Sequence, residues 1–147
     1  MVSTLTKATV TVAFAMLTVV QSSPVLAQTA AATTAVENPT VTALARAQLD
    51  ALRAGKIDRS QYTSQVNAHF TDSDVASAAQ LFGRGGAVKT FAYAGNEVRN
   101  GITVSQYTVE FEHPISVPMM PTTANWIESI ATDKGGKISY IAFDPKK

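Results

Sequence analysis

The chain has 147 residues, a formal net charge of +1 and no cysteine, and 46% of its residues are apolar. This length is typical of one domain, and so high an apolar fraction with so little net charge excludes a disordered chain. The lack of cysteine excludes disulfides, thiolate metal sites and cysteine nucleophiles, and the balanced charge provides no basic surface that would favour nucleic acid.

The first 27 residues have the layout of a secretory signal peptide. Lys7 is the only charged residue before Glu37, residues 8–20 are all apolar or Thr, and Val25–Ala27 forms a small-x-small cleavage site. The apolar stretch is shorter than the roughly 20 residues of a membrane-spanning helix, although an uncleaved anchor is the alternative. We therefore predict cleavage after Ala27 and a secreted or periplasmic protein with no membrane span.

Residues 28–37 are rich in Ala and Thr without periodicity and are predicted to be a flexible leader, followed by a single domain at 38–147. A first helix is predicted to begin at Asn38, a good N-cap residue that precedes Pro39. Gly55 is predicted to end this helix, because glycine readily adopts the left-handed conformation found at helix ends.

Two shorter helices are predicted to follow. Asp58 with Gln61 and Thr71 with Asp74 both have the spacing of a capping box, so one helix is predicted to begin at Asp58 and the next at Thr71. The glycines at positions 83, 85 and 86 are predicted to end the third helix.

From residue 87 the pattern changes to that of β-strands. Gly95-Asn96 is predicted to be a turn, and Asn100-Gly101 a hairpin turn, because both of its positions tolerate positive φ. The apolar residues after this hairpin change parity, which predicts either a bulge near Ser105-Gln106 or a strand covered on both faces. The residues concerned are Ile102 and Val104 on one parity and Tyr107, Val109 and Phe111 on the other.

The last third of the chain completes the predicted sheet. The stretch His113–Pro121 contains three prolines and is predicted to be a loop or an edge, and two further strands are predicted at 124–131 and 138–143. Three helices followed by about four antiparallel strands indicate an α+β fold. The first helix has the apolar face needed to cover one side of the sheet.

Reactive chemistry is sparse in this sequence. Neither His69 nor His113 has another histidine at helical spacing, so no metal site is predicted. There is no Gly-x-Ser-x-Gly elbow, and no Ser-x-x-Lys motif occurs in the predicted mature domain. We therefore predict no catalytic residue and no cofactor.

Three aromatic residues are the best candidates for ligand binding. Tyr107, Trp126 and Tyr140 lie on three separate predicted strands and are expected to point to one face of the sheet. Each offers an apolar body with a polar tip, which suits a ligand pocket, whereas ordinary packing in the core is the alternative.

The segment Leu52–Thr63 (LRAGKIDRSQYT) resembles a segment of small exported bacterial domains of the nuclear transport factor 2-like, or cystatin-like, type. Similar segments occur in accessory domains of bacterial serine hydrolases. The turn Asp133–Ile138 and the strand ending at Phe143-Asp144-Pro145 resemble the end of the same domain. This resemblance implies N-terminal helices packed on a curved antiparallel sheet, a cystatin-like roll with a conical pocket. It also implies a homodimer through the outer face of the sheet.

Members with this fold include isomerases, dehydratases and proteins without catalysis, so the fold leaves the function open. The main hypothesis is an exported, non-catalytic domain that binds a small apolar molecule or a protein partner. One alternative is a small pocket enzyme, an isomerase or lyase. Another is an interaction or inhibitor module that uses the sheet edge or the Pro-rich loop Ile115–Pro121.

Overall fold

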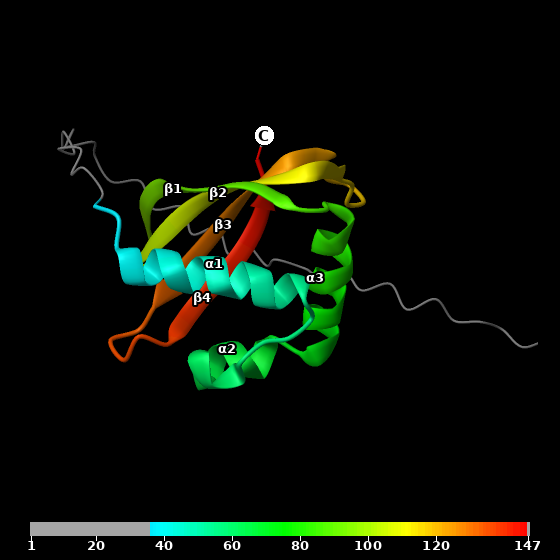
Figure 1. Ribbon diagram of the computed structural model, residues 1–147. Coiled ribbons are helices and arrows are strands. Elements are labelled where there is room, and N and C mark those ends of the chain that lie inside the picture. Colours follow the sequence, from blue (N-terminus) through cyan, green and yellow to red (C-terminus); the bar gives the residue numbers. More distant parts are fainter. Residues whose placement is uncertain (1–35, 147) are drawn as a thin grey trace, which may run out of the picture. The chain divides into compact units, whose positions relative to one another are not determined.

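The computed structural model describes residues 36–146, in which three α-helices precede an antiparallel sheet (Figure 1). In chain order the elements are α1 (Pro39–Arg53), the short 3-10 helix η1 (Arg59–Gln61), α2 (Ser64–His69), α3 (Asp72–Arg84), β1 (Val88–Arg99), β2 (Ile102–Ile115), β3 (Thr123–Thr132) and β4 (Ile138–Pro145). The sheet has the order β1-β2-β3-β4, with every neighbouring pair antiparallel. The predicted α+β class is confirmed. The predicted signal peptide at 1–27 and residues 28–35 of the predicted leader lie outside the described residues.

Helix α1 crosses one face of the sheet (Figure 1) and begins where the sequence predicts. The side chain of Asn38 accepts hydrogen bonds from the backbone N–H groups of Thr40 and Val41, at 3.0 and 3.4 Å. These bonds satisfy two of the N–H groups that have no partner within the helix. The helix buries one face against the sheet, made of Ala45, Gln48, Leu49 and Leu52.

Gly55 adopts the left-handed conformation predicted for it, with φ at +66°. A methyl group added there would lie 3.5 Å from Ala79 Cβ, an ordinary contact, so the backbone alone decides its cost. We expect Gly55→Ala to lower the free energy of unfolding by about 1 kcal/mol, measured by urea denaturation. Gly83→Ala is the matched control, since Gly83 lies inside α3 with nothing near its Cβ position and should gain about 0.5–1 kcal/mol. An unchanged urea denaturation midpoint for Gly55→Ala would contradict a cost of the positive φ at this position.

The prediction of a helix that begins at Asp58 is wrong in the extent of that helix. Asp58 caps only η1, and α2 begins after its own N-cap, Thr63. Between them Tyr62 is extended and forms a parallel bridge with Ile138, while the Thr63 N–H donates to the Ile138 carbonyl at 3.0 Å. This pairing with β4 interrupts a helix that local sequence alone favours.

Helix α3 begins with the predicted capping box, in which Thr71 and Asp74 exchange hydrogen bonds between side chain and backbone. The helix continues through Gly83 to Arg84 and is capped by Gly85. Gly86 then takes a positive φ of +72° as the chain turns toward β1. The predicted capping-box start is therefore confirmed, and the helix ends at Arg84, one residue beyond Gly83, the first of the predicted stops.

The β1–β2 hairpin turns at Asn100-Gly101 as predicted, with φ values of +50° and +79°. The turn predicted at Gly95-Asn96 is wrong, because both residues lie inside β1 at a register shift, where Gly95 has φ +136°. Tyr93 pairs with Tyr107 and Gly95 with Gln106, so one extra residue bulges out of β1. The parity change predicted a bulge near Ser105-Gln106 of β2. The bulge lies instead in β1, directly opposite that position.

Strand β2 is longer than predicted, since it includes His113 and Pro114. Its pairing with β3 is interrupted between Glu110 and Ile115, so the missing N–H of Pro114 removes no ladder hydrogen bond there. The His113 N–H instead donates to the Gly85 carbonyl at 2.8 Å. This contact ties the end of α3 to the sheet.

The core between helices and sheet has two adjoining clusters. One surrounds Phe82 of α3, and the other surrounds Tyr107 of β2. Their buried members are Leu49, Phe82, Val109, Phe111, Ile115 and Trp126 in the first, and Ala45, Tyr62, Tyr107, Ile130 and Ile138 in the second. Helix α1 contributes Leu49 to the first cluster and Ala45 to the second.

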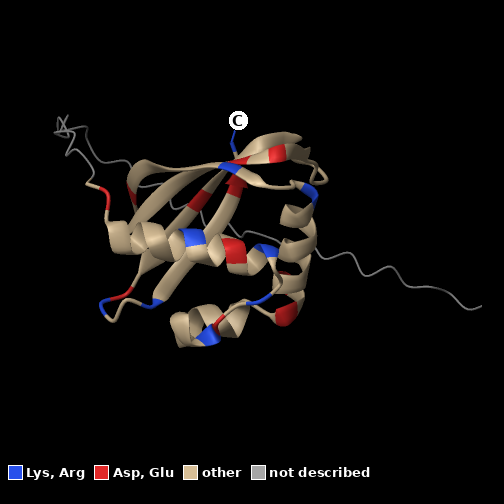
Figure 2. Cartoon of the chain, in the orientation of Figure 1, with Lys and Arg blue, Asp and Glu red and all other residues tan. Residues whose placement is uncertain are grey.

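Charged residues of both signs are spread over helices, strands and turns (Figure 2). None of the helices formed by residues 36–146 combines the length and apolar character needed to cross a bilayer.

Candidate ligand-binding groove

The structure separates the three aromatic residues predicted to share one face. Tyr107 and Trp126 are 0% and 2% exposed and belong to the core beneath the helices. Their polar tips are satisfied there, because the Tyr107 and Thr42 hydroxyls share a hydrogen bond of 3.1 Å and Trp126 Nε1 donates to the Thr123 carbonyl. Tyr140 lies on the opposite face of the sheet.

Strand register explains the position of Tyr140. Ile130 points into the core and pairs with Ile141, so the next pair, Ala131 with Tyr140, points outward. The register shift after Ala131 lies beyond this pair, and it lets Ile138, which has the same sequence parity as Tyr140, face the core. On the outer face the Tyr140 hydroxyl receives a hydrogen bond of 3.0 Å from Arg99. The prediction of a shared face is therefore correct for Tyr107 and Trp126 and wrong for Tyr140.

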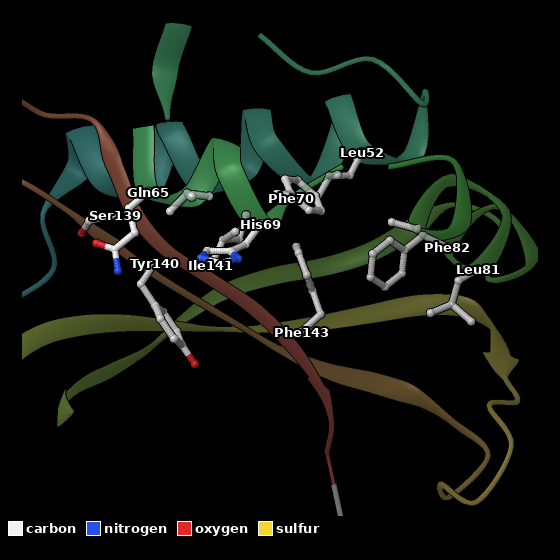
Figure 3. Close-up of a pocket in the computed structure, with 12 residues that line it drawn as sticks. Leu52, Gln65, His69, Phe70, Leu81, Phe82, Ser139, Tyr140, Ile141 and Phe143 are labelled. Atoms are coloured by element: carbon white, nitrogen blue, oxygen red, sulfur yellow. The ribbon is translucent and has the colours of Figure 1, made fainter. Parts of the chain in front are cut away.

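A groove of about 490 Å³ lies between α2, α3 and the edge strand β4 (Figure 3). Most of its lining is apolar and aromatic, and α1 contributes one residue to it. The lining residues are Leu52, Gln65, Val66, His69, Phe70, Ala78, Leu81, Phe82, Ser139, Tyr140, Ile141 and Phe143. This volume is within the range of small-molecule sites, and such sites are mostly apolar with a few polar groups.

The groove exists because the sheet ends at β4 while the helices extend past it. Among the described residues, β3 is the only strand that pairs with β4. On its other edge, β4 has just the single bridge between Ile138 and Tyr62. The bend between α2 and α3 is held by Arg59, which donates to the Phe70 carbonyl at 2.7 Å and pairs with Asp72. The two helices therefore form one wall and the strand edge the other.

The polar residues of the groove gather toward one end. In Figure 3, Gln65 and Ser139 lie at one end and Leu81 and Phe82 at the other, with His69 between them. No Lys, Arg, Asp or Glu of the described chain is among the lining residues. The groove therefore has an apolar body with a hydrogen-bonding end that carries no permanent charge.

Glu128 is the most unusual residue of the core, and the sequence analysis did not select it. It is 0% exposed, and neither carboxyl oxygen has a hydrogen-bond partner within the described part of the chain. It lies in a row across the inner face of the sheet, between Tyr107 and Phe143. Its alternation with Trp126 and Ile130 in the predicted strand was a signal that could have found it.

Burial raises the pKa of Glu128 well above its ordinary value, and the negative charge of Asp50 raises it further. The positive charge of Arg46 opposes this rise of the pKa. Because the carboxyl is desolvated and unpartnered, its environment favours the protonated, uncharged form. It is not among the residues that line the groove.

A second buried polar group accompanies Glu128 beneath α1. Tyr62 donates a hydrogen bond to Gln48 Oε1, and the amide of Gln48 donates in turn to Gln61. Burial, together with the nearby Glu128, raises the pKa of Tyr62 to about 12. This network runs from the buried Tyr62 to the exposed Gln61, and none of its three residues lines the groove.

Metal ligation has no candidate in the described residues, where no cluster of three or more His, Asp or Glu side chains could hold an ion. His69 lies on the groove rim and His113 at the end of β2. Asp72, three residues after His69, pairs with Arg59 instead.

Comparison of the chain with models of known protein families, with curated proteins and with solved structures gives no significant match.

Proposed function

We propose that this protein is an exported, non-catalytic domain that binds a small apolar molecule in the groove between α2, α3 and β4. The proposal includes a nuclear transport factor 2-like, cystatin-like roll, which rests on the resemblance of Leu52–Thr63 and the C-terminal turn and strand. Export to the periplasm or medium rests on the signal-peptide pattern of residues 1–27.

The observation that carries the binding function is the apolar lining of the groove. Phe70, Phe82 and Phe143 present aromatic surface there, and each is packed against one of the two core clusters or belongs to it. Burying apolar ligand surface against such side chains is favourable by about 25 cal/mol per Å². Anchoring in the core lets the groove keep its shape without a ligand, which lowers the entropic cost of binding.

An isomerase or lyase is less well supported by the same geometry. Proton transfer from carbon needs an acid or base within hydrogen-bond reach of the substrate. No Asp or Glu of the described residues lines the groove, and the unusual carboxyl of Glu128 is enclosed in the core. His69 does line the groove, but it is exposed and has no hydrogen-bond partner among the described residues that would orient it as a base.

A protein-interaction role is the second candidate, and one observation favours it. The loop between β2 and β3 carries Met119, which is fully exposed, and Met120, which is about half exposed. Exposed methionines provide adaptable apolar contacts for a protein partner.

Naphthalene is a suitable probe for the proposed function, because its rigid apolar ring system suits the groove. We expect it to raise the melting temperature of the purified protein in proportion to the logarithm of its concentration above Kd. Ala78→Phe, which places a ring in the groove from α3, should abolish this rise. Ala47→Phe on the exposed face of α1 is the matched control and should preserve it.

Two results would contradict the proposed function. One is the absence of any naphthalene effect on the folded protein. The other is an equal effect on Ala78→Phe, which would place the probe elsewhere. If Ala78→Phe fails to fold, Leu81→Asp tests the same site with a charge instead of added bulk, and it too should abolish the rise.

A further inference from the structure

The polar end of the groove has unused hydrogen-bonding capacity. Gln65 and His69 project from α2, four residues apart on one helical face, and neither side chain makes a hydrogen bond to another described residue. Across the groove Ser139 donates to the Ala131 carbonyl at 3.3 Å, which leaves its oxygen free to accept. Two elements therefore present three polar side chains to whatever occupies this end.

The chemistry of these side chains selects among head groups. The amide of Gln65 and the hydroxyl of Ser139 can each both donate and accept hydrogen bonds. Gln65 is exposed at this end, and a carboxylate or ammonium head placed there would find no Lys, Arg, Asp or Glu in the lining to pair with. A hydroxyl or carbonyl head loses less hydration and finds both donors and acceptors.

We propose that the ligand of this groove is a neutral amphiphile, with an apolar ring or chain body and one uncharged oxygen head group. The body lies against Leu81, Phe82 and Phe143, and the head lies at Gln65 and Ser139 (Figure 3). This inference rests on the proposed function and adds the class and orientation of the ligand.

Three compounds with one ring system test the head group. Isothermal titration calorimetry at neutral pH compares naphthalene, 2-naphthol and 2-naphthoate, which carry no head, a neutral hydroxyl and a carboxylate. We expect 2-naphthol to bind about fivefold tighter than naphthalene for each hydrogen bond it gains, and 2-naphthoate to bind more weakly than 2-naphthol.

A variant pair assigns the effect to the polar end. Gln65→Leu keeps the size of the side chain and removes its polar group, so the advantage of 2-naphthol over naphthalene should fall by about fivefold. Gln80→Leu is the matched control, because Gln80 is an exposed residue of α3 outside the groove lining, and it should leave the ratio unchanged.

The outcomes separate this inference from the proposed function. Equal affinities for naphthalene and 2-naphthol, tightest binding by 2-naphthoate, or a ratio that Gln65→Leu leaves intact would overturn the neutral amphiphile while leaving an apolar site in place. No binding of naphthalene to the folded protein would instead overturn the proposed function.

Discussion

Phe82→Ala is expected to lower the free energy of unfolding by about 3–5 kcal/mol, measured by urea denaturation. The ring is 2% exposed and stacks on Phe111, with centroids 5.7 Å apart and planes at 9°. It also meets the edge of Trp126 at 5.9 Å and tilts against Phe143 at 4.9 Å. Truncation therefore removes buried apolar surface and leaves a cavity where α3 packs on the sheet.

Phe82→Leu is the control for this effect, because it retains most of the volume and should cost only about 1 kcal/mol. If Phe82→Ala lowers the free energy of unfolding by less than about 1 kcal/mol, the packing of this ring between α3 and the sheet contributes less than expected, which would contradict its role in the core. Phe82 also lines the groove, so its packing and the shape of the groove depend on each other.

Glu128→Met is expected to raise the free energy of unfolding by about 1–3 kcal/mol. Methionine has a similar length and removes two buried oxygens that have no described hydrogen-bond partner. Asp144→Met, on an exposed residue of β4 whose carboxylate has no described hydrogen-bond partner, is the control and should change stability by less than about 0.5 kcal/mol. A clear loss of stability for Glu128→Met would show that the carboxyl makes favourable interactions in the folded protein.

The pH dependence of stability has a definite sign at Glu128. Its pKa is raised in the folded state above its ordinary value of 4.5, so between these two values the folded state binds more protons than the unfolded state. The contribution of Glu128 to the free energy of unfolding is therefore fully present below pH 4.5. It is lost as pH rises toward the folded pKa, by up to about 1.4 kcal/mol per pH unit.

Glu128→Gln should remove this loss, because the amide does not titrate. Denaturation midpoints measured from acid to alkaline pH should diverge, with the wild type falling relative to the variant as pH rises. Arg46 and Asp50 of α1, Tyr62 and Tyr107 also carry or acquire charge near this position, and they are the same in both proteins. Parallel curves would contradict a protonated Glu128.

Local chemistry made much of the fold predictable. The N-cap at Asn38, the capping box of Thr71 with Asp74 and the hairpin at Asn100-Gly101 all depend on residues within a few positions of one another. The order of helices and strands followed from these signals together with the apolar periodicity.

The failures share a different physical cause. Tyr62 leaves the helical pattern because it pairs with Ile138, a residue distant in the sequence. Tyr140 faces outward because its neighbour Ile141 pairs with the core residue Ile130, whereas Ile138, of the same sequence parity as Tyr140, faces the core beyond a register shift. Both depend on tertiary pairing, which overrides local propensity.

The groove was equally out of reach of sequence patterns, since four separate elements line it. Glu128 differs, because its parity with Trp126 marks it as inward-facing in the sequence itself.

The most direct test of a ligand groove between α2, α3 and β4 is an NMR titration of the labelled protein with naphthalene. We expect saturable amide shift changes at Val66, Leu81 and Ile141, which line the groove from α2, α3 and β4, and none at Thr90 or Val98 of β1, which lie outside its lining. Changes centred on β1 or on the Met119 loop, with the groove residues unmoved, would contradict it.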